Sequence, residues 1–309
     1  MKRKIILGIG TSFLPIDLYK IEVMKNFPKL SIGIATFNGE RTLKRCINSL
    51  LTQSFQDFEI IISDDNSTDQ TVQIVEDLCK KHKNIKFFRQ KGGLREFRQK
   101  KFILEKCDTP FIKFLDQDDY LDSSNYIEVS YLKLRQGYDL VFSNTSIEIY
   151  DENTLVERRD NIMFPYSKCQ SGFDYAIASL SEASMIFYSF FSKSVLDKYF
   201  SHYFPSFISN AAYSEGVFGT DLVLNEKVLY LPEINSVSTE SNYNNTSNLQ
   251  SLELFEPYIN YLKGMMNLGS QLSILQKFKY YYELFINVFP TLSRLTAVTM
   301  LNKLNFYKK

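Results

Sequence analysis

Apolar and polar residues alternate along the first half of the chain in blocks that predict strands followed by helices. Short continuous apolar runs, typical of strands covered on both faces, occur at Leu30–Thr36, Phe58–Ser63, Ile85–Phe88, Phe111–Leu115 and Asp139–Ser143. Stretches with helical periodicity separate them, at Glu40–Gln53, Thr68–Lys81, Leu94–Lys106 and Ser123–Arg135. This alternation predicts an α/β fold with a mostly parallel sheet sandwiched by helices.

Capping signals mark two of these helices. Ser67 followed by Gln70 fits a capping box, and Asp122 is expected to be the N-cap of the fourth helix. Such oxygens accept hydrogen bonds from the unpaired amides of a first helical turn.

The alternation weakens after about residue 144. Asn235–Ser251 is rich in Ser and Asn and predicts a loop or linker, whereas Leu252–Lys309 has a helical pattern rich in Tyr, Phe and Lys. The 309 residues are therefore expected to form an N-terminal extra segment (1–28), one α/β domain (29–240, with halves 29–145 and 146–240) and a helical C-terminal extension (241–309).

Composition excludes several classes of function. The net charge of +1 gives no argument for nucleic acid binding. The four cysteines form no CxxC pair and are interpreted as thiols in a reducing cytosol, and two distant histidines offer little for a zinc site. The N-terminus imitates a signal peptide, but its apolar part is short and broken, so we interpret it as a non-cleaved segment. No run is long and apolar enough to span a bilayer.

Three polar clusters follow predicted strands. They are Thr36-Phe37-Asn38, Asp64-Asp65-Asn66 and Asp116-Gln117-Asp118-Asp119. Each cluster alone also fits an ordinary turn. Because ligands of parallel sheets bind at the carboxyl ends of the strands, three clusters on one edge favour a binding site.

The acidic cluster carries the most specific chemistry. Asp116 and Asp118 stand at positions i and i+2 of an extended chain and therefore point to the same side. Their charges repel unless a cation lies between them, and a divalent cation completed by substrate phosphates is the usual solution. This indicates an enzyme that handles a nucleoside diphosphate. Asp119 could bind a metal water or cap the next helix.

The motifs in this order resemble those of family-2 glycosyltransferases with the GT-A fold. Leu30–Thr71 resembles the family's opening, in which a strand, a T-[YF]-N turn and a helix lead to DD-x-S-x-D-x-T. FLDQDD resembles its metal-binding D-x-D element, and Val228–Glu233 (VLYLPE) resembles its closing strand. The similarity covers residues 29–240. It implies a GT-A (Rossmann-like) domain with a nucleotide-binding half and an acceptor half.

The resemblance also implies roles for single residues. Asp116 and Asp118 would hold the ribose and the Mn²⁺ or Mg²⁺ that bridges the two phosphates, and Phe37 would offer a flat face to the base. Arg98 is the expected phosphate-binding residue among the basic residues of its helix, with a solvated basic face as the alternative. The expected nucleotide-sugar site comprises Thr36, Phe37, Asn38, Asp64, Asp65, Arg98, Asp116 and Gln117.

A general base is needed to take a proton from the acceptor hydroxyl. The family usually places it in a Glu-Asp pair, but here Gly216 follows Glu215. Glu215 is the expected base, and Asp221 is the alternative.

These features predict an inverting glycosyltransferase of the hexosyltransferase type. It would move a sugar from a nucleoside-diphosphate sugar, with a UDP-sugar as the expected donor, to a hydroxyl of a saccharide or lipid-linked acceptor. The expected setting is bacterial surface polysaccharide synthesis (O-antigen, capsule or lipooligosaccharide). A non-catalytic sugar-nucleotide-binding relative is the alternative that Gly216 favours. A nucleotidyltransferase would need a glycine-rich loop where TFNGER stands.

The C-terminal region leaves two interpretations open. Stretches such as Phe278–Phe289 combine aromatic residues with lysines, as in helices that lie on a membrane. A helical lid or a dimer face is the other interpretation of residues 252–309. The expected location is cytoplasmic, with peripheral contact at the inner face of the plasma membrane under the first interpretation.

Overall fold

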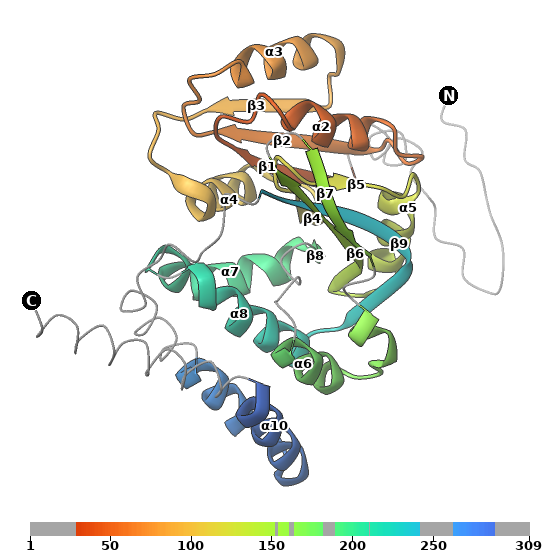
Figure 1. Ribbon diagram of the computed structural model, residues 1–309, viewed down its shortest axis with the longest axis vertical. Helices are drawn as coiled ribbons and strands as arrows, with labels where there is room; N and C mark the ends of the chain where they lie inside the picture. The colour runs from red at the N-terminus through yellow and green to blue at the C-terminus, as the bar shows by residue number, and fades with distance from the viewer. Residues whose placement is uncertain are drawn as a thin grey trace, which may run out of the picture.

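The fold is a mixed α/β sheet covered by helices on both faces (Figure 1). The structure is a computed structural model, and it describes residues 29–151, 154–160, 164–181, 189–209, 211–241 and 262–287. Within these residues the sheet has nine strands in the order β3-β2-β1-β4-β8-β6-β9-β5, with β7 paired to β6. Six strands run in the same direction, and β5, β7 and β8 run against them.

The first half follows the predicted alternation closely. Its strands are β1 (Leu30–Thr36), β2 (Phe58–Asp64), β3 (Ile85–Arg89) and β4 (Phe111–Phe114). Its helices are α2 (Leu43–Leu51), α3 (Thr71–Lys81), α4 (Arg95–Lys106) and α5 (Tyr126–Arg135). The mostly parallel sheet sandwiched by helices is therefore confirmed.

The second half contains the strands predicted at Asp139–Ser143 and Val228–Glu233, both longer than expected, and further elements that the sequence pattern did not reveal. The strands are β5 (Tyr120–Leu121), β6 (Leu140–Asp151), β7 (Thr154–Arg159), β8 (Phe190–Ser192) and β9 (Val228–Ser241). The helices are η1 (Phe164–Lys168), α6 (Gly172–Ser181), α7 (Lys193–Ser209), α8 (Ala211–Asn225) and α10 (Ile274–Asn287). Residues 262–270 are also helical.

Two apolar cores lie on opposite faces of the sheet. One core joins Ile32 and Ile60 to α2, α3 and α5. The other joins Phe114 and Phe142 to α4, α6, α7 and α8. Because both faces are covered there, the central strands β1, β2 and β4 are mostly apolar along their length, and the polar clusters lie at their carboxyl ends.

Three local predictions were wrong. The N-cap of α3 is Gln70, because Ser67 bonds to Asp64 instead of forming a capping box. The N-cap of α5 is Asn125, while Asp122 forms an ion pair with Arg158 at 3.3 Å. The loop expected from residue 235 is strand through residue 241, since Ser and Asn there pair with β6.

The described part of the C-terminal extension is helical, as expected. Residues 262–270 and α10 bury Leu262, Met265 and Tyr280 in a small separate core. Phe173 and Ile177 of α6 pack against it. The N-terminal segment 1–28 lies outside the described residues.

Candidate active site

The ends of β1 and β4 meet through Gln117. Its Oε1 accepts hydrogen bonds from Thr36 Oγ1 and, at 3.1 Å, from the amide of Phe37. Its Nε2 donates to the carbonyl oxygen of Phe37 at 3.2 Å. The amide of Asp65, at the end of β2, donates to the carbonyl oxygen of Thr36 at 2.9 Å. The three predicted clusters therefore do share one edge of the sheet.

The turn after β1 is held in a special conformation. Asn38 has a φ of 50°, in the left-handed region. Its amide donates to Ser67 Oγ at 2.8 Å, and its Oδ1 accepts from the amide of Thr68 at 2.9 Å. A Cβ on Gly39 would collide with the side-chain ends of Gln117 and Thr36, so a larger residue there would displace the Gln117 side chain.

Asp64 and Asp65 occupy unlike positions. The Asp64 carboxylate is fully buried and accepts hydrogen bonds from the amide and hydroxyl of Ser67. It therefore lies beneath the site and shapes the turn. Asp65 accepts from the amides of Leu94 and Arg95, both at 2.9 Å, and thereby orients the start of α4. Each of its oxygens has a further lone pair that could accept a hydrogen bond from a nucleotide. That contact remains a prediction.

A polar cleft opens at this edge. Its volume is about 450 Å³. Phe37 precedes the lining residue Asn38 and is 52% exposed. Its backbone amide donates a hydrogen bond to Gln117. The lining residues are Asn38, Glu40, Arg41, Thr42, Thr68, Asp69, Gln117 and Asp118.

The acidic loop, Asp116–Asp119, follows β4, and its three carboxylates differ in environment. Burial and the nearby charge of Asp116 raise the pKa of Asp118 to about 6. Asp119 is almost fully buried, and its Oδ1 accepts from the amide of Thr239 at 2.9 Å. Burial first, then the charges of Asp116 and Asp118, raise the pKa of Asp119 well above its usual value. Asp119 thus ties the loop to β9 and does not cap α5.

Lys100 on α4 is a basic residue that reaches a carboxylate of this loop. Its Nζ lies 3.3 Å from Asp116 Oδ1 and also pairs with Glu96. Arg98, the residue chosen from the sequence, is exposed on α4. Phe97 and Lys100 are three positions apart and share the buried face of the helix, which is the signal that could have identified Lys100. A contact of Arg98 with the donor stays a prediction.

A second lysine lies behind the loop. Lys113 on β4 is fully buried, with its Nζ 5.5 Å from the ring centre of Tyr126 and 5.7 Å from that of Phe190. Burial lowers the pKa of Lys113 to about 7, and the charges of Asp119 and Asp116 oppose this shift. The only sequence signal was a charged residue inside an apolar strand.

The acidic pair fits a divalent cation that is shared with a substrate. Within the described ranges, no group of three or more His, Cys, Asp or Glu side chains is placed to hold a metal ion by itself. Asp116 and Asp118 instead form a partly exposed pair whose mutual repulsion helps to raise the pKa of Asp118. Coordination by one or two carboxylates, with substrate phosphates among the remaining ligands, is typical of Mg²⁺.

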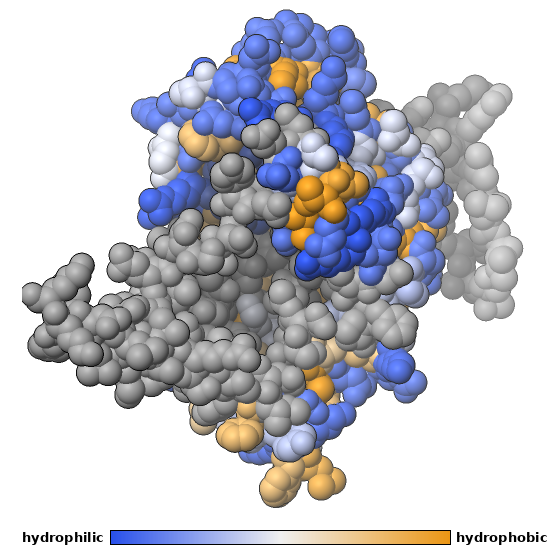
Figure 2. Space-filling view, viewed as in Figure 1, coloured by the Kyte–Doolittle hydropathy of each residue, from blue (hydrophilic) through white to orange (hydrophobic). Residues whose placement is uncertain are grey.

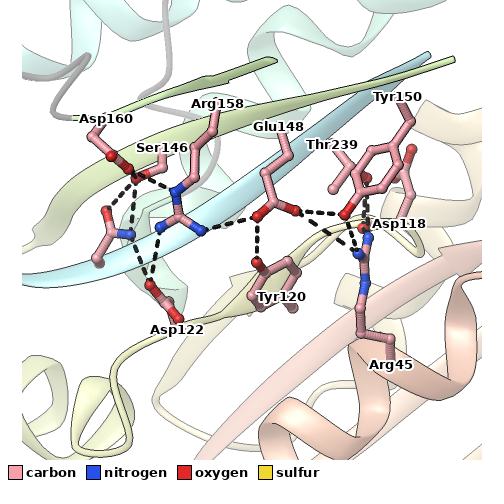
Figure 3. Close-up of polar contacts among 11 residues, drawn as sticks. Arg45, Asp118, Tyr120, Asp122, Ser146, Glu148, Tyr150, Arg158, Asp160 and Thr239 are labelled. Atoms are coloured by element: carbon pink, nitrogen blue, oxygen red, sulfur yellow. Dashed lines mark hydrogen bonds and ion pairs between the residues drawn. The ribbon is translucent and has the colours of Figure 1, made fainter. Parts of the chain in front are cut away.

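A polar network supports the loop from α2 (Figure 3). Arg45 Nη2 donates to the carbonyl oxygen of Asp118 at 2.9 Å, and Thr239 Oγ1 donates to the same oxygen at 2.7 Å. The guanidinium carbon of Arg45 lies 4.7 Å from the ring centre of Tyr120 and 5.7 Å from that of Tyr150. Sequence reasoning missed Arg45, because only the fold brings it to the loop.

Glu148 extends this network to the hairpin of β6 and β7 (Figure 3). Its buried carboxylate accepts hydrogen bonds from the hydroxyls of Tyr120 and Tyr150, both at 2.9 Å. It also pairs with Arg158 Nη1 at 2.9 Å, and Arg158 pairs with Asp122. The loop, α2 and the hairpin are therefore linked by hydrogen bonds and ion pairs.

Replacing Arg45 by methionine tests this support. We expect the Mn²⁺ concentration for half-maximal donor turnover to rise about 10-fold, because a charged donor to the loop backbone contributes about 1.5–3 kcal/mol. The rate at saturating Mn²⁺ should change less. Lys44→Met, an exposed change on the same helix, is the control. An unchanged metal response in Arg45→Met would contradict the role.

The proposed general bases lie on α8. Glu215 falls in this helix, but its side chain lies outside what the structure describes. Asp221, the alternative, accepts hydrogen bonds from Tyr203 OH and Asn225 Nδ2, both at 2.8 Å. These contacts place the Asp221 carboxylate where α7 packs on α8. Glu215 as the base remains a prediction.

An acidic loop and a polar cleft thus lie together at the carboxyl edge of a Rossmann-like sheet, where ligands of such sheets bind. The family model described as Glycosyl transferase family 2 matches residues 31–200. The chain therefore belongs to glycosyl transferase family 2.

A curated relative is also a glycosyltransferase by name. Over 175 residues the chain is 34% identical to the GalNAc(5)-diNAcBac-PP-undecaprenol beta-1,3-glucosyltransferase of Campylobacter jejuni, covering 55% of this chain. The match spans about half (53%) of that relative.

Solved structures show the fold. S. aureus TarS 1–349 in complex with UDP has a TM-score of 0.58 at 18% identity and covers 83% of this chain and 69% of its own. The mannosyltransferase PcManGT from Pyrobaculum calidifontis, in complex with GDP-Man and Mn²⁺, has a TM-score of 0.55 at 11% identity. It covers 88% of this chain and 74% of its own. The fold is thus GT-A.

Proposed function

We propose that this protein is an inverting glycosyltransferase of bacterial surface polysaccharide synthesis. It moves a sugar from a nucleoside-diphosphate sugar to a hydroxyl of a saccharide or lipid-linked acceptor. The observation that carries the proposal is the pairing of Asp116 and Asp118 at the end of β4, beside the polar cleft. A UDP-sugar is the expected donor. The TarS structure of this fold holds UDP and that of PcManGT holds GDP-Man, so the donor panel below is needed to identify the base.

The residues at this edge of the sheet have different roles in binding the donor. Phe37 would stack on the base, Asp65 would accept hydrogen bonds from the nucleotide, and Asp116 and Asp118 would hold the metal. Bound Mn²⁺ or Mg²⁺ supplies Lewis-acid stabilisation of the departing diphosphate. Lys100 adds positive charge next to Asp116.

Transfer is a single displacement at the anomeric carbon. The acceptor oxygen forms a bond to this carbon on the face opposite the diphosphate, and the carbon–oxygen bond to the diphosphate breaks. The leaving diphosphate takes the electron pair, and Glu215 takes the proton of the acceptor hydroxyl. Inversion follows because the two oxygens occupy opposite faces.

The acceptor is proposed to be carried by a lipid. The C. jejuni relative is named for a polyprenyl-diphosphate-linked saccharide, which supports a lipid-linked acceptor for this chain as well. The reaction would then take place in the cytoplasm, at the inner face of the plasma membrane. None of the described helices is long and apolar enough to cross a bilayer.

A panel of donors tests the proposal. The protein is incubated with UDP-, GDP- and dTDP-sugars, with Mn²⁺ or with EDTA, and released nucleoside diphosphate is measured. We expect slow hydrolysis of one donor, UDP-linked, that falls at least about 10-fold in EDTA. Donor binding without release in any arm would favour the non-catalytic relative. Pyrophosphate release in a further arm, which holds a nucleoside triphosphate and a sugar 1-phosphate, would favour a nucleotidyltransferase.

A further inference from the structure

Helix α10 has two unlike faces. Tyr280 and Leu284 are buried in the small C-terminal core that packs against α6. Ile274 and Phe278 are each 74% exposed, and Tyr282 and Phe285 are each 62% exposed. The four exposed residues recur at intervals of four, four and three, so they form one stripe along the helix. Packing on the α/β domain therefore uses only one side of α10.

The exposed stripe forms a shallow groove rather than isolated apolar positions. The groove has a volume of about 490 Å³, and Lys277 borders it. Apolar surface gathers at the end of the molecule where α10 lies (Figure 2). Single exposed apolar residues are common on protein surfaces, but a continuous apolar stripe marks a binding surface.

The charge of this region differs from that of the rest of the chain. Residues 262–309 contain seven Lys and Arg and one acidic residue, Glu283, which gives a net charge of +6. The whole chain has a net charge of +1, so residues 1–261 are net acidic. Of the basic residues, Lys277 and Lys279 lie on α10 itself. An apolar aromatic stripe with adjacent lysines is the composition of helices that bind anionic bilayers.

We propose that the α10 stripe, Ile274, Phe278, Tyr282 and Phe285, docks on the surface of a bilayer that contains anionic lipids. The helix lies in the plane of the interface, with its aromatic side chains among the acyl chains and its lysines at the headgroups. A second copy is a poorer occupant, because a face-to-face pair would bring the Lys277 side chains that border the two grooves close together. The inference rests on the proposed function, since a lipid-linked acceptor is presented at such a surface.

Vesicle flotation tests the docking surface with the full chain. We expect the protein to float with phosphatidylglycerol-containing vesicles at least 10-fold more than with phosphatidylcholine vesicles, and 0.5 M NaCl should reduce this difference. The double variant Phe278→Glu/Phe285→Glu should lose flotation. Leu132→Glu, a matched change at a 53% exposed position of α5, should float like the parent protein.

Two results would overturn the docking surface. One is unchanged flotation of the double variant with an unchanged melting temperature. The other is a concentration-dependent dimer of the parent, measured by light scattering, that the double variant loses, which would assign the stripe to a second copy. Metal-dependent release of nucleoside diphosphate, measured without vesicles, should be the same in the double variant. Loss of docking is thereby separated from failure of the proposed transferase activity.

Discussion

Replacing Asp118 by asparagine is expected to lower metal-dependent release of nucleoside diphosphate by at least about 100-fold. Asparagine keeps the shape of the side chain but removes the charge that holds the cation. The backbone contacts of Asp118 with Arg45 and Thr239 involve its carbonyl oxygen and survive the change. Donor release with and without Mn²⁺ is the measurement.

Thermal unfolding without metal separates chemistry from folding in this variant. Burial and Asp116 raise the pKa of Asp118 to about 6, so the folded state disfavours its charge. The resulting destabilisation is absent below the unfolded pKa, grows between about pH 4 and pH 6, and is complete above pH 6. At pH 7 the variant should therefore melt no lower than the parent. Asp122→Asn, which alters the contacts of this carboxylate with Arg158 and Asn235, should retain activity. An Asp118→Asn protein with normal Mn²⁺-dependent turnover would remove Asp118 from the metal site.

Replacing Glu215 by glutamine is expected to keep donor binding and lower sugar transfer by about 100- to 10,000-fold, because glutamine cannot accept the acceptor proton. Binding of the donor found in the panel would be measured by calorimetry, and transfer by radiolabelled sugar incorporated into a lipid-linked acceptor fraction. The distinction matters because Gly216 stands where the family usually has a second carboxylate.

Asp221→Asn provides the matched comparison. Asp221 is bonded to Tyr203 and Asn225 between α7 and α8, so its loss should lower the melting temperature more than the intrinsic rate of transfer. Normal transfer by Glu215→Gln would exclude Glu215 as the base. If Asp221→Asn then lost transfer with unchanged melting, the base would be Asp221.

The architecture of the first half was predictable because it depends on local pattern. β1 was predicted at its observed bounds, and β2 and β4 within one residue, since runs such as FEIIIS have a continuous apolar core. The second half was less accessible. All six residues of β7 are exposed, so the strand has no apolar alternation to read, and it is defined by its pairing with β6. The Ser and Asn residues of β9 were interpreted as a linker because they are polar, and their pairing with β6 is what makes them a strand.

The sequence was also insufficient to identify the basic residue of α4 that reaches the acidic loop. Arg98 and Lys100 are two positions apart on α4, and either could be imagined at the phosphates. Helix phase relative to the sheet decides between them, and it buries Lys100 against Asp116 while Arg98 faces outward. In the same way, Asp64 and Asp65 are neighbours in one motif, yet one is buried under the turn and the other orients α4.

By itself, the sequence determined the alternation of strands and helices, the edge at which Thr36, Asp65 and Asp118 meet, and the expectation of a metal-assisted nucleotide site. These depend on periodicity and on motif order, which are properties of the chain read in sequence. Only the tertiary structure showed that Lys100 reaches Asp116, that Arg45 and Glu148 support the acidic loop, and that α10 keeps one apolar face exposed. Those facts depend on how distant elements pack, because burial and charge pairing are decided by neighbours in space.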